Sequence, residues 1–153
     1  TRSEWILAKM LFMLFLAFIS TSVTISVGIL AFGINVTINL LTITIIIATS
    51  FLFSGIGMII GRFVKEEETA DMAAGAISFP MMFLAGTFFA VDSMPSIIQI
   101  IARALPLFYV NEGLRNAMIY MNQAEALLNT GIVLIFATIF FIAGVLLTKW
   151  KED

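Results

Sequence analysis

Four long apolar runs dominate the sequence and are separated by short polar clusters. They cover residues 5–32, 40–61, 72–91 and 126–148. Each reaches the length of about 20 apolar residues that an α-helix needs to cross the hydrocarbon core of a bilayer. Because polar positions do not alternate with apolar ones inside the runs, the apolar side chains cannot all face one internal core. The pattern predicts four transmembrane helices.

The segment between the third and fourth runs, about residues 95–121, has a different pattern. Pro95 and Pro106 bracket roughly ten residues, about half of what a spanning helix needs. Gln99 and Arg103 share one face of this piece and isoleucines occupy the rest, which predicts an amphipathic helix dipping into the membrane edge. A second short helix after Pro106 would complete a re-entrant hairpin.

Composition supports an embedding in lipid. The chain is 61% hydrophobic and 12% charged, and its mean hydropathy is +1.08, above what a soluble domain with a polar surface has. We predict an all-α fold: a polytopic membrane helix bundle of four transmembrane helices plus a short external re-entrant helical hairpin. Residues 1–153 would form one transmembrane domain. Because the chain opens with Thr1 and its first run is too long for a signal-peptide core, we expect a fragment of a longer protein.

The cations are distributed unequally between the two sides of this arrangement. Two of them, Arg103 and Arg115, fall on the side of the hairpin. The others fall on the opposite side, and they are Arg2, Lys9, Arg62, Lys65, Lys149 and Lys151. The positive-inside rule therefore predicts a multi-pass protein of the cell membrane with cytoplasmic N- and C-termini and an external hairpin.

Several classes of chemistry lack the residues they need. There is no Cys and no His, so thiolate chemistry, disulfides and the commonest transition-metal ligands are excluded. The sequence has no phosphate-binding loop, and its scattered cations form no basic stripe for nucleic acid. No catalytic, cofactor-binding or metal-binding residue is predicted. No ionisable residue lies near the middle of a run, so any uphill transport would draw its energy from another polypeptide.

Small residues recur at helical spacing in the first two runs. They are Ser20, Thr24 and Gly28 in the first, and Ser50, Ser54, Gly57 and Gly61 in the second. Small side chains let helix backbones approach closely in lipid. These faces either serve helix packing alone or form a subunit interface or the lining of a translocation path.

Two polar groups are further candidates. The loop after the second run carries Lys65, Glu66, Glu67, Glu68 and Asp71. It is either a docking site for a cytoplasmic partner or a solvated loop whose acids favour the start of the next helix. The hairpin carries a candidate external gate made of Arg103, Tyr109, Glu112 and Arg115. The structural alternative is a plain exposed ion pair between Glu112 and Arg115.

Four stretches in the second half carry a family resemblance. They are FPMMFLAGTFF at 79–89, SMP at 93–95, LPLFY at 105–109 and EGLR at 112–115. In order and spacing they resemble the ABC-2 type transporter permeases, where a Ser-Gly-x-Phe-Phe-like stretch precedes a Met-Pro, a short external helix and an Asn-Pro-Leu-x-Tyr-like turn. Ala85 stands where Ser is frequent in that family, and Leu105 stands where Asn is frequent.

The resemblance implies a function and partners. The four runs would be helices three to six of a permease subunit in an ATP-binding cassette exporter of an amphiphilic solute, drug, lipid or glycan. ATP hydrolysis would occur on a separate cytoplasmic subunit, near residues 65–71, and a second permease subunit would complete a dimer. The hairpin would cap the outer mouth. The main alternative is a membrane scaffold or assembly factor that transports nothing. A passive channel is less favoured because no run shows a polar ring suited to ion selectivity.

Overall fold

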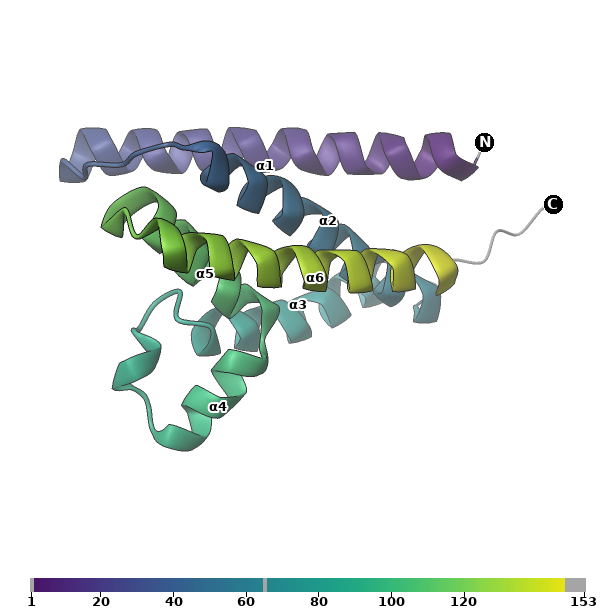
Figure 1. Cartoon of the computed structure of the whole chain (residues 1–153). Helices are drawn as coiled ribbons and strands as arrows, with labels where there is room; N and C mark the ends of the chain where they lie inside the picture. Colours follow the sequence, from purple (N-terminus) through teal and green to yellow (C-terminus); the bar gives the residue numbers. More distant parts are fainter. Residues whose placement is uncertain (1, 65, 148–153) are drawn as a thin grey trace.

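Every regular element of the chain is a helix within the described residues, 2–64 and 66–147 of the computed structural model (Figure 1). The order is α1 (Arg2–Phe32), α2 (Leu40–Phe63), α3 (Glu67–Leu84), the 3-10 turn η1 (Val91–Ser93), α4 (Ser96–Ala104), α5 (Pro106–Arg115), the π-helical turn η2 (Asn116–Tyr120) and α6 (Gln123–Leu147). The all-α prediction is confirmed.

Three of these helices are long and apolar enough to cross a membrane: Leu11–Phe32 within α1, Leu40–Phe63 and Gln123–Leu147. The pair formed by α4 and α5–η2, which is bent by 90°, would be a fourth span if it is counted as one. The described residues thus form a polytopic helical bundle, as the apolar runs predicted. In Figure 1 α1 runs opposite to α2 and α6, so that the start of α1 and the ends of α2 and α6 lie at one end of the bundle.

The third predicted run differs most from the observed helix. α3 begins at Glu67 rather than at residue 72, because acidic residues are favourable at the positive end of a helix dipole. It ends at Leu84 rather than at residue 91, because Gly86, in the turn after Leu84, adopts a φ of 82° that a helix cannot continue through. The apolar part, residues 72–84, is shorter than a full span, and α3 is not among the candidate spans.

The core of the described bundle lies between α2, α5 and α6. Ile45 and Leu52 of α2 and Val133 of α6 are fully buried and belong to one apolar cluster that Val110 of α5 also joins. α2 and α6 make the most extensive helix pair. Since lipid is as apolar as these side chains, the pair is held by close packing and not by exclusion from water.

The closest approach of α2 and α6 occurs at two glycines. A Cβ atom on Gly55 would lie 2.5 Å from the backbone C and O of Phe140. One on Gly144 would lie 2.7 Å from the carbonyl oxygen of Gly55. Real Cβ atoms do not come this close to backbone, so the two helices touch backbone to backbone here.

α1 stands apart from this core. Figure 1 shows it along one edge of the bundle, joined to α2 by the loop of residues 33–39. No residue of its candidate span is buried, and Leu30 is 86% exposed. Most of the apolar surface of this span is therefore available to lipid or to other helices.

Candidate functional site

Two short helices form a sharply bent segment in the part of the bundle away from the start of α1 (Figure 1). α4 and α5–η2 meet at a bend of 90°. Pro106 occupies the first turn of α5, where its missing N–H costs no hydrogen bond. Leu105 before it is extended, with φ −87° and ψ 133°, as a residue preceding proline prefers. The two prolines thus produce the hairpin that their spacing predicted.

α5 fastens the turn that follows α3. The Nδ2 of Asn111 donates to the carbonyl oxygen of Ala85 and to the hydroxyl of Thr87, both at 2.9 Å. The Nη2 of Arg115 donates to the carbonyl oxygen of Gly86 at 2.9 Å. Because Asn111 and Arg115 lie one helical turn apart, they reach three consecutive residues together. We call Asn111, Arg115 and these bonds the α5 clamp.

Glu112 and Arg115 are paired, but not as an isolated surface pair. The Nη1 of Arg115 lies 2.8 Å from the Oε1 of Glu112, and each side chain is 29% exposed. The same guanidinium also holds Gly86 through its other nitrogen. Glu112 therefore orients the cation that closes the α5 clamp, and the pair joins the hairpin to the end of α3.

The other two residues of the predicted external gate make no hydrogen bond or ion pair with Glu112 or Arg115 among the described residues. The Tyr109 hydroxyl donates to the carbonyl oxygen of Arg103 at 2.8 Å, which bridges the bend. The side chain of Arg103 is exposed and makes no hydrogen bond or ion pair with any described residue. Arg103 therefore lies across the 90° bend from Tyr109, Glu112 and Arg115, which all belong to α5.

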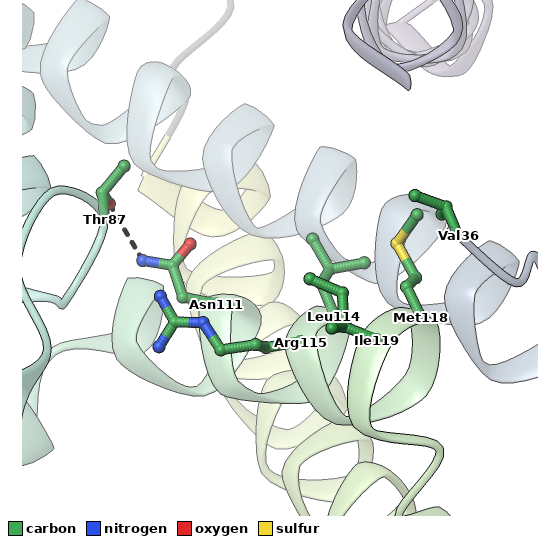
Figure 2. Close-up of a pocket in the computed structure, with 7 residues that line it drawn as sticks. All are labelled: Val36, Thr87, Asn111, Leu114, Arg115, Met118 and Ile119. Carbon is green, nitrogen blue, oxygen red and sulfur yellow. Dashed lines mark hydrogen bonds between the residues drawn. The ribbon is translucent and has the colours of Figure 1, made fainter. Parts of the chain in front are cut away.

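A cavity of about 210 Å³ opens beside the α5 clamp (Figure 2). Its polar end holds Thr87, Asn111 and Arg115, and its apolar end is lined by Val36, Leu114, Met118 and Ile119. Of these seven lining residues, only Arg115 was predicted from the sequence. Among the others, only Asn111 had a usable signal, since it precedes Arg115 by four residues on the same helix face.

The loop of residues 33–39 is fastened to η2. The Nδ2 of Asn39 donates to the carbonyl oxygen of Ala117 at 2.9 Å, and the backbone N–H of Thr37 donates to that of Met118 at 3.0 Å. These carbonyls belong to the last turn of α5–η2 and have no partner within their helix. The Oδ1 of Asn39 also caps α2 by accepting from the N–H of Thr42. Asn39 thus ties the start of α2 to the end of the hairpin.

The acidic candidates for a cytoplasmic docking site lie at the opposite end of the bundle. Glu66, Glu67, Glu68 and Asp71 are all exposed at the start of α3, and Lys65 lies outside the described residues. Among the residues whose placement is described, no group of three or more His, Cys, Asp or Glu side chains could hold a metal ion. The group is an exposed anionic surface next to Arg62 in the last turn of α2.

The structure divides the small-residue candidates. Ser54 is buried, and Ser50 is partly buried with its hydroxyl donating to the carbonyl of Ile46. Gly57 and Gly61 are exposed, and no atom lies within 4 Å of a Cβ built on either. Two residues correspond to about 200° of helical rotation, so Gly57 faces away from the contact that Gly55 makes.

On α1 the small residues make no close contact with another helix. Ser20 and Thr24 are exposed, and the Thr24 hydroxyl donates to the Ser20 carbonyl of its own helix at 2.8 Å. A Cβ on Gly28 would meet only the side chain of Ile34, at 3.6 Å. The closest contact between helices of the described chain therefore uses Gly55 and Gly144, which the spacing pattern did not indicate.

The comparisons with known proteins agree with this architecture. The family model described as ABC-2 type transporter matches residues 1–119. The "Probable multidrug ABC transporter permease YbhS" of Escherichia coli (strain K12) is 28% identical over 145 residues, which are 93% of this chain and 38% of that protein. "Nodulation protein J" of Rhizobium leguminosarum bv. viciae is 26% identical over 110 residues, 72% of this chain and 42% of that protein.

A third relative is the "Inner membrane transport permease YadH" of Escherichia coli (strain K12), 23% identical over 97 residues, 63% of this chain and 38% of that protein. The chain thus spans about two fifths of the length of the curated relatives it matches. No solved structure matches it. Since the family match covers most of a helical membrane bundle, the chain belongs to the ABC-2 type transporter family.

Proposed function

We propose that this chain is part of the membrane permease subunit of an ATP-binding cassette exporter that moves an amphiphilic solute. Energy would come from ATP hydrolysis on a separate cytoplasmic subunit. The observation that carries the proposal is the family match over residues 1–119. The name of the E. coli relative YbhS includes "multidrug ABC transporter permease", and drugs are one class of amphiphile within the proposal.

The candidate spans support an external source of energy. Leu11–Phe32 contains no ionisable side chain, Leu40–Phe63 contains only Arg62 near its end, and Gln123–Leu147 contains only Glu125 near its start. A carrier driven by an ion gradient needs a titrating or coordinating group near the bilayer midplane. None of these spans has one, which favours coupling to an ATPase.

Two exposed surfaces suit the proposed partners. The acidic start of α3, Glu66 to Asp71, projects from the end of the bundle where α1 starts and would meet the ATP-binding subunit. The apolar span of α1 has no buried residue and would be covered by a second permease subunit or further helices. With this end in the cytoplasm, the hairpin would face outside.

The cavity beside the α5 clamp favours an amphiphile as the solute. Hydrogen-bond donors of Asn111 and Arg115 gather at one end, and Leu114 and Met118 offer apolar surface at the other (Figure 2). A solute with a polar head and an apolar body matches this division. The α5 clamp would act as the outer gate, since Glu112 and Arg115 join the hairpin to the end of α3.

Reconstitution tests the proposal. The full-length subunit and its ATPase, placed in vesicles, should move fluorescent amphiphiles only when ATP is hydrolysed. A variant ATPase that binds but does not hydrolyse ATP is the control. Accumulation of a solute driven by an ion gradient, without the ATPase, would contradict the proposal. A stably assembled complex with no flux over a broad panel of amphiphiles would instead favour the scaffold alternative.

The gate has its own test in the same vesicles. Arg115→Gln removes the charge that holds Gly86, so ATP-dependent flux should change severalfold because the hairpin is released. Glu125→Gln is the matched control, since Glu125 is exposed near the start of α6 and its carboxylate makes no hydrogen bond or ion pair with a described residue. Equal flux in the two variants would show that the clamp does not control passage.

A further inference from the structure

One face of α4 is strongly apolar and is left uncovered by the described part of the chain. Ile97 is 74% exposed, Ile100 is 72% exposed and Ile101 is 45% exposed. Ala102, on the opposite side of this short helix, is completely buried. In an amphipathic helix packed on a protein the apolar side faces inward, whereas here most of it faces outward.

Hydrogen bonds hold α4 in this orientation. The Nε2 of Gln99 donates to the carbonyl oxygens of Met94 at 2.9 Å and Asp92 at 3.3 Å. At the other end, the Tyr109 hydroxyl donates to the carbonyl of Arg103. Turning the isoleucines inward would break these bonds, so the outward apolar face is a fixed part of the fold.

A cation flanks the apolar face. Arg103 lies three residues after Ile100, so the two side chains are neighbours on the helix surface. Its side chain is exposed, and none of its five N–H donors is used by a described residue. An apolar strip beside a free guanidinium matches the two parts of an anionic phospholipid, its acyl chains and its phosphate.

The surroundings of α4 are also apolar and exposed. α3 packs against α4, and it carries Phe79 and Phe83, both exposed, with ring centroids 5.0 Å apart. Phe88, in the loop after α3, is exposed too, and its ring centroid lies 5.0 Å from that of Phe83. The outward face of α4 therefore belongs to a larger region of exposed apolar side chains.

We propose that α4 is a lipid-binding helix at the membrane interface. Ile97, Ile100 and Ile101 insert at the boundary between head groups and acyl chains, and Arg103 binds the phosphate of an anionic phospholipid. Arg103 is then a lipid anchor and not part of the external gate. The proposal requires that the chain lies in a membrane, but not that it exports a solute, so the two proposals can fail independently.

The depth of α4 can be measured with a single probe. These 153 residues contain no Cys, so Ile100→Cys introduces one thiol for an environment-sensitive fluorophore, with any cysteine elsewhere in the full-length subunit replaced by serine. The assembled complex is placed in phosphatidylcholine nanodiscs with nitroxide-labelled lipids. The label should emit at shorter wavelength and be quenched by nitroxides near the head group. Gln123→Cys, at an exposed polar position at the start of α6, should be quenched by aqueous iodide instead.

The same probe distinguishes the other possible surroundings. Quenching of the Ile100→Cys label by iodide to the same extent as the Gln123→Cys label would show that α4 lies in water, which overturns the proposal. Protection from both iodide and lipid nitroxides would show that protein, such as a second copy of the chain, covers this face. That result also overturns it.

The role of Arg103 requires a comparison of lipid charges. Nitroxide-labelled phosphatidylglycerol, present as a minor lipid, should be enriched near the Ile100→Cys label about fivefold over labelled phosphatidylcholine, the size expected for one cation near the membrane surface. Arg103→Gln should reduce this ratio to about one. Arg62→Gln, which removes an exposed cation at the other end of the bundle, should leave it unchanged. An unaltered ratio in Arg103→Gln, or no enrichment in the parent protein, would refute the assignment of Arg103.

Discussion

Two strongly apolar parts of this molecule behave in opposite ways. α2 and α6 bury side chains such as Leu52 and Val133 completely and touch at Gly55 and Gly144. α1 is long and apolar enough to cross a membrane, yet its candidate span contains no buried residue. Hydrophobicity decides which solvent a helix occupies. It does not decide which helices pack, because lipid provides no hydrophobic drive for helix association.

Polar side chains reinforce the difference. On α1 the hydroxyls of Thr24 and Ser26 donate to carbonyls of their own helix, so they provide no bond to a neighbour. At the hairpin, Asn39, Asn111 and Arg115 donate across elements to helix ends and turns. Polar side chains thus either bond within their own helix or join two elements, depending on whether an unpaired carbonyl of another element lies within reach.

The largest expected effect breaks the close contact of α2 and α6. Gly55→Ala places a methyl group 2.5 Å from the backbone of Phe140, so the helices must separate at a cost of about 3 kcal/mol, the upper part of the range for overpacking. Gly57→Ala, in the same helix but with no atom near its Cβ, should be neutral or slightly stabilising. Reversible unfolding of the detergent-solubilised protein would measure both, and equal stabilities would disprove the glycine contact.

A second substitution compares a buried with an exposed leucine. Leu52→Ala, at a fully buried position, should lower the free energy of unfolding by about 2 kcal/mol. This is the low end for buried leucines, because a side chain that moves from protein to lipid stays in an apolar environment and only the cost of the cavity remains. Leu30→Ala, at a position of α1 that is 86% exposed, should change the free energy of unfolding little. The same unfolding measurement applies. A large loss for Leu30→Ala would reveal a partner on α1 in the full-length protein.

The α5 clamp should give a smaller, local effect. Asn111→Ala removes two hydrogen bonds to the turn after α3, a loss of about 1–2 kcal/mol. Amide hydrogen exchange in residues 85–90 should become faster, while exchange in α6 stays unchanged. Asn35→Ala, an exposed position in the loop after α1, is the control. Unchanged exchange in residues 85–90 would mean that the turn holds its shape without α5.

The smallest effect is expected on α1. Thr24→Ala removes a hydroxyl that bonds only to its own helix, so stability should stay within about 0.5 kcal/mol of the parent. Unfolding of the assembled complex, compared with that of the isolated subunit, would check this. A clear loss confined to the complex would identify this face of α1 as a subunit contact.

Much of the fold was accessible from residue patterns. The positions of Pro95 and Pro106 predicted a broken segment between the long runs, and the structure has two short helices there with a 90° bend. The ends of α3 could not be predicted from the sequence. Glu67 and Glu68 have the polarity of a loop, and only the structure shows that they form the first turn of the helix. The set of Arg103, Tyr109, Glu112 and Arg115 remains a prediction as a gate, and the pattern did not reveal that Arg103 lies across the 90° bend from the other three.

The sequence by itself determined that this chain belongs in lipid, where its long helices run and where the chain must break. Those properties follow from the length of apolar runs and from proline geometry, which are local. The tertiary structure alone decided that Gly55 and not Gly57 meets α6, that Asn39 joins α2 to η2, and that Arg103 is separated from Arg115. These contacts depend on the rotation and crossing of whole helices, because in lipid the packing of helix surfaces, and not their hydrophobicity, decides which helices associate.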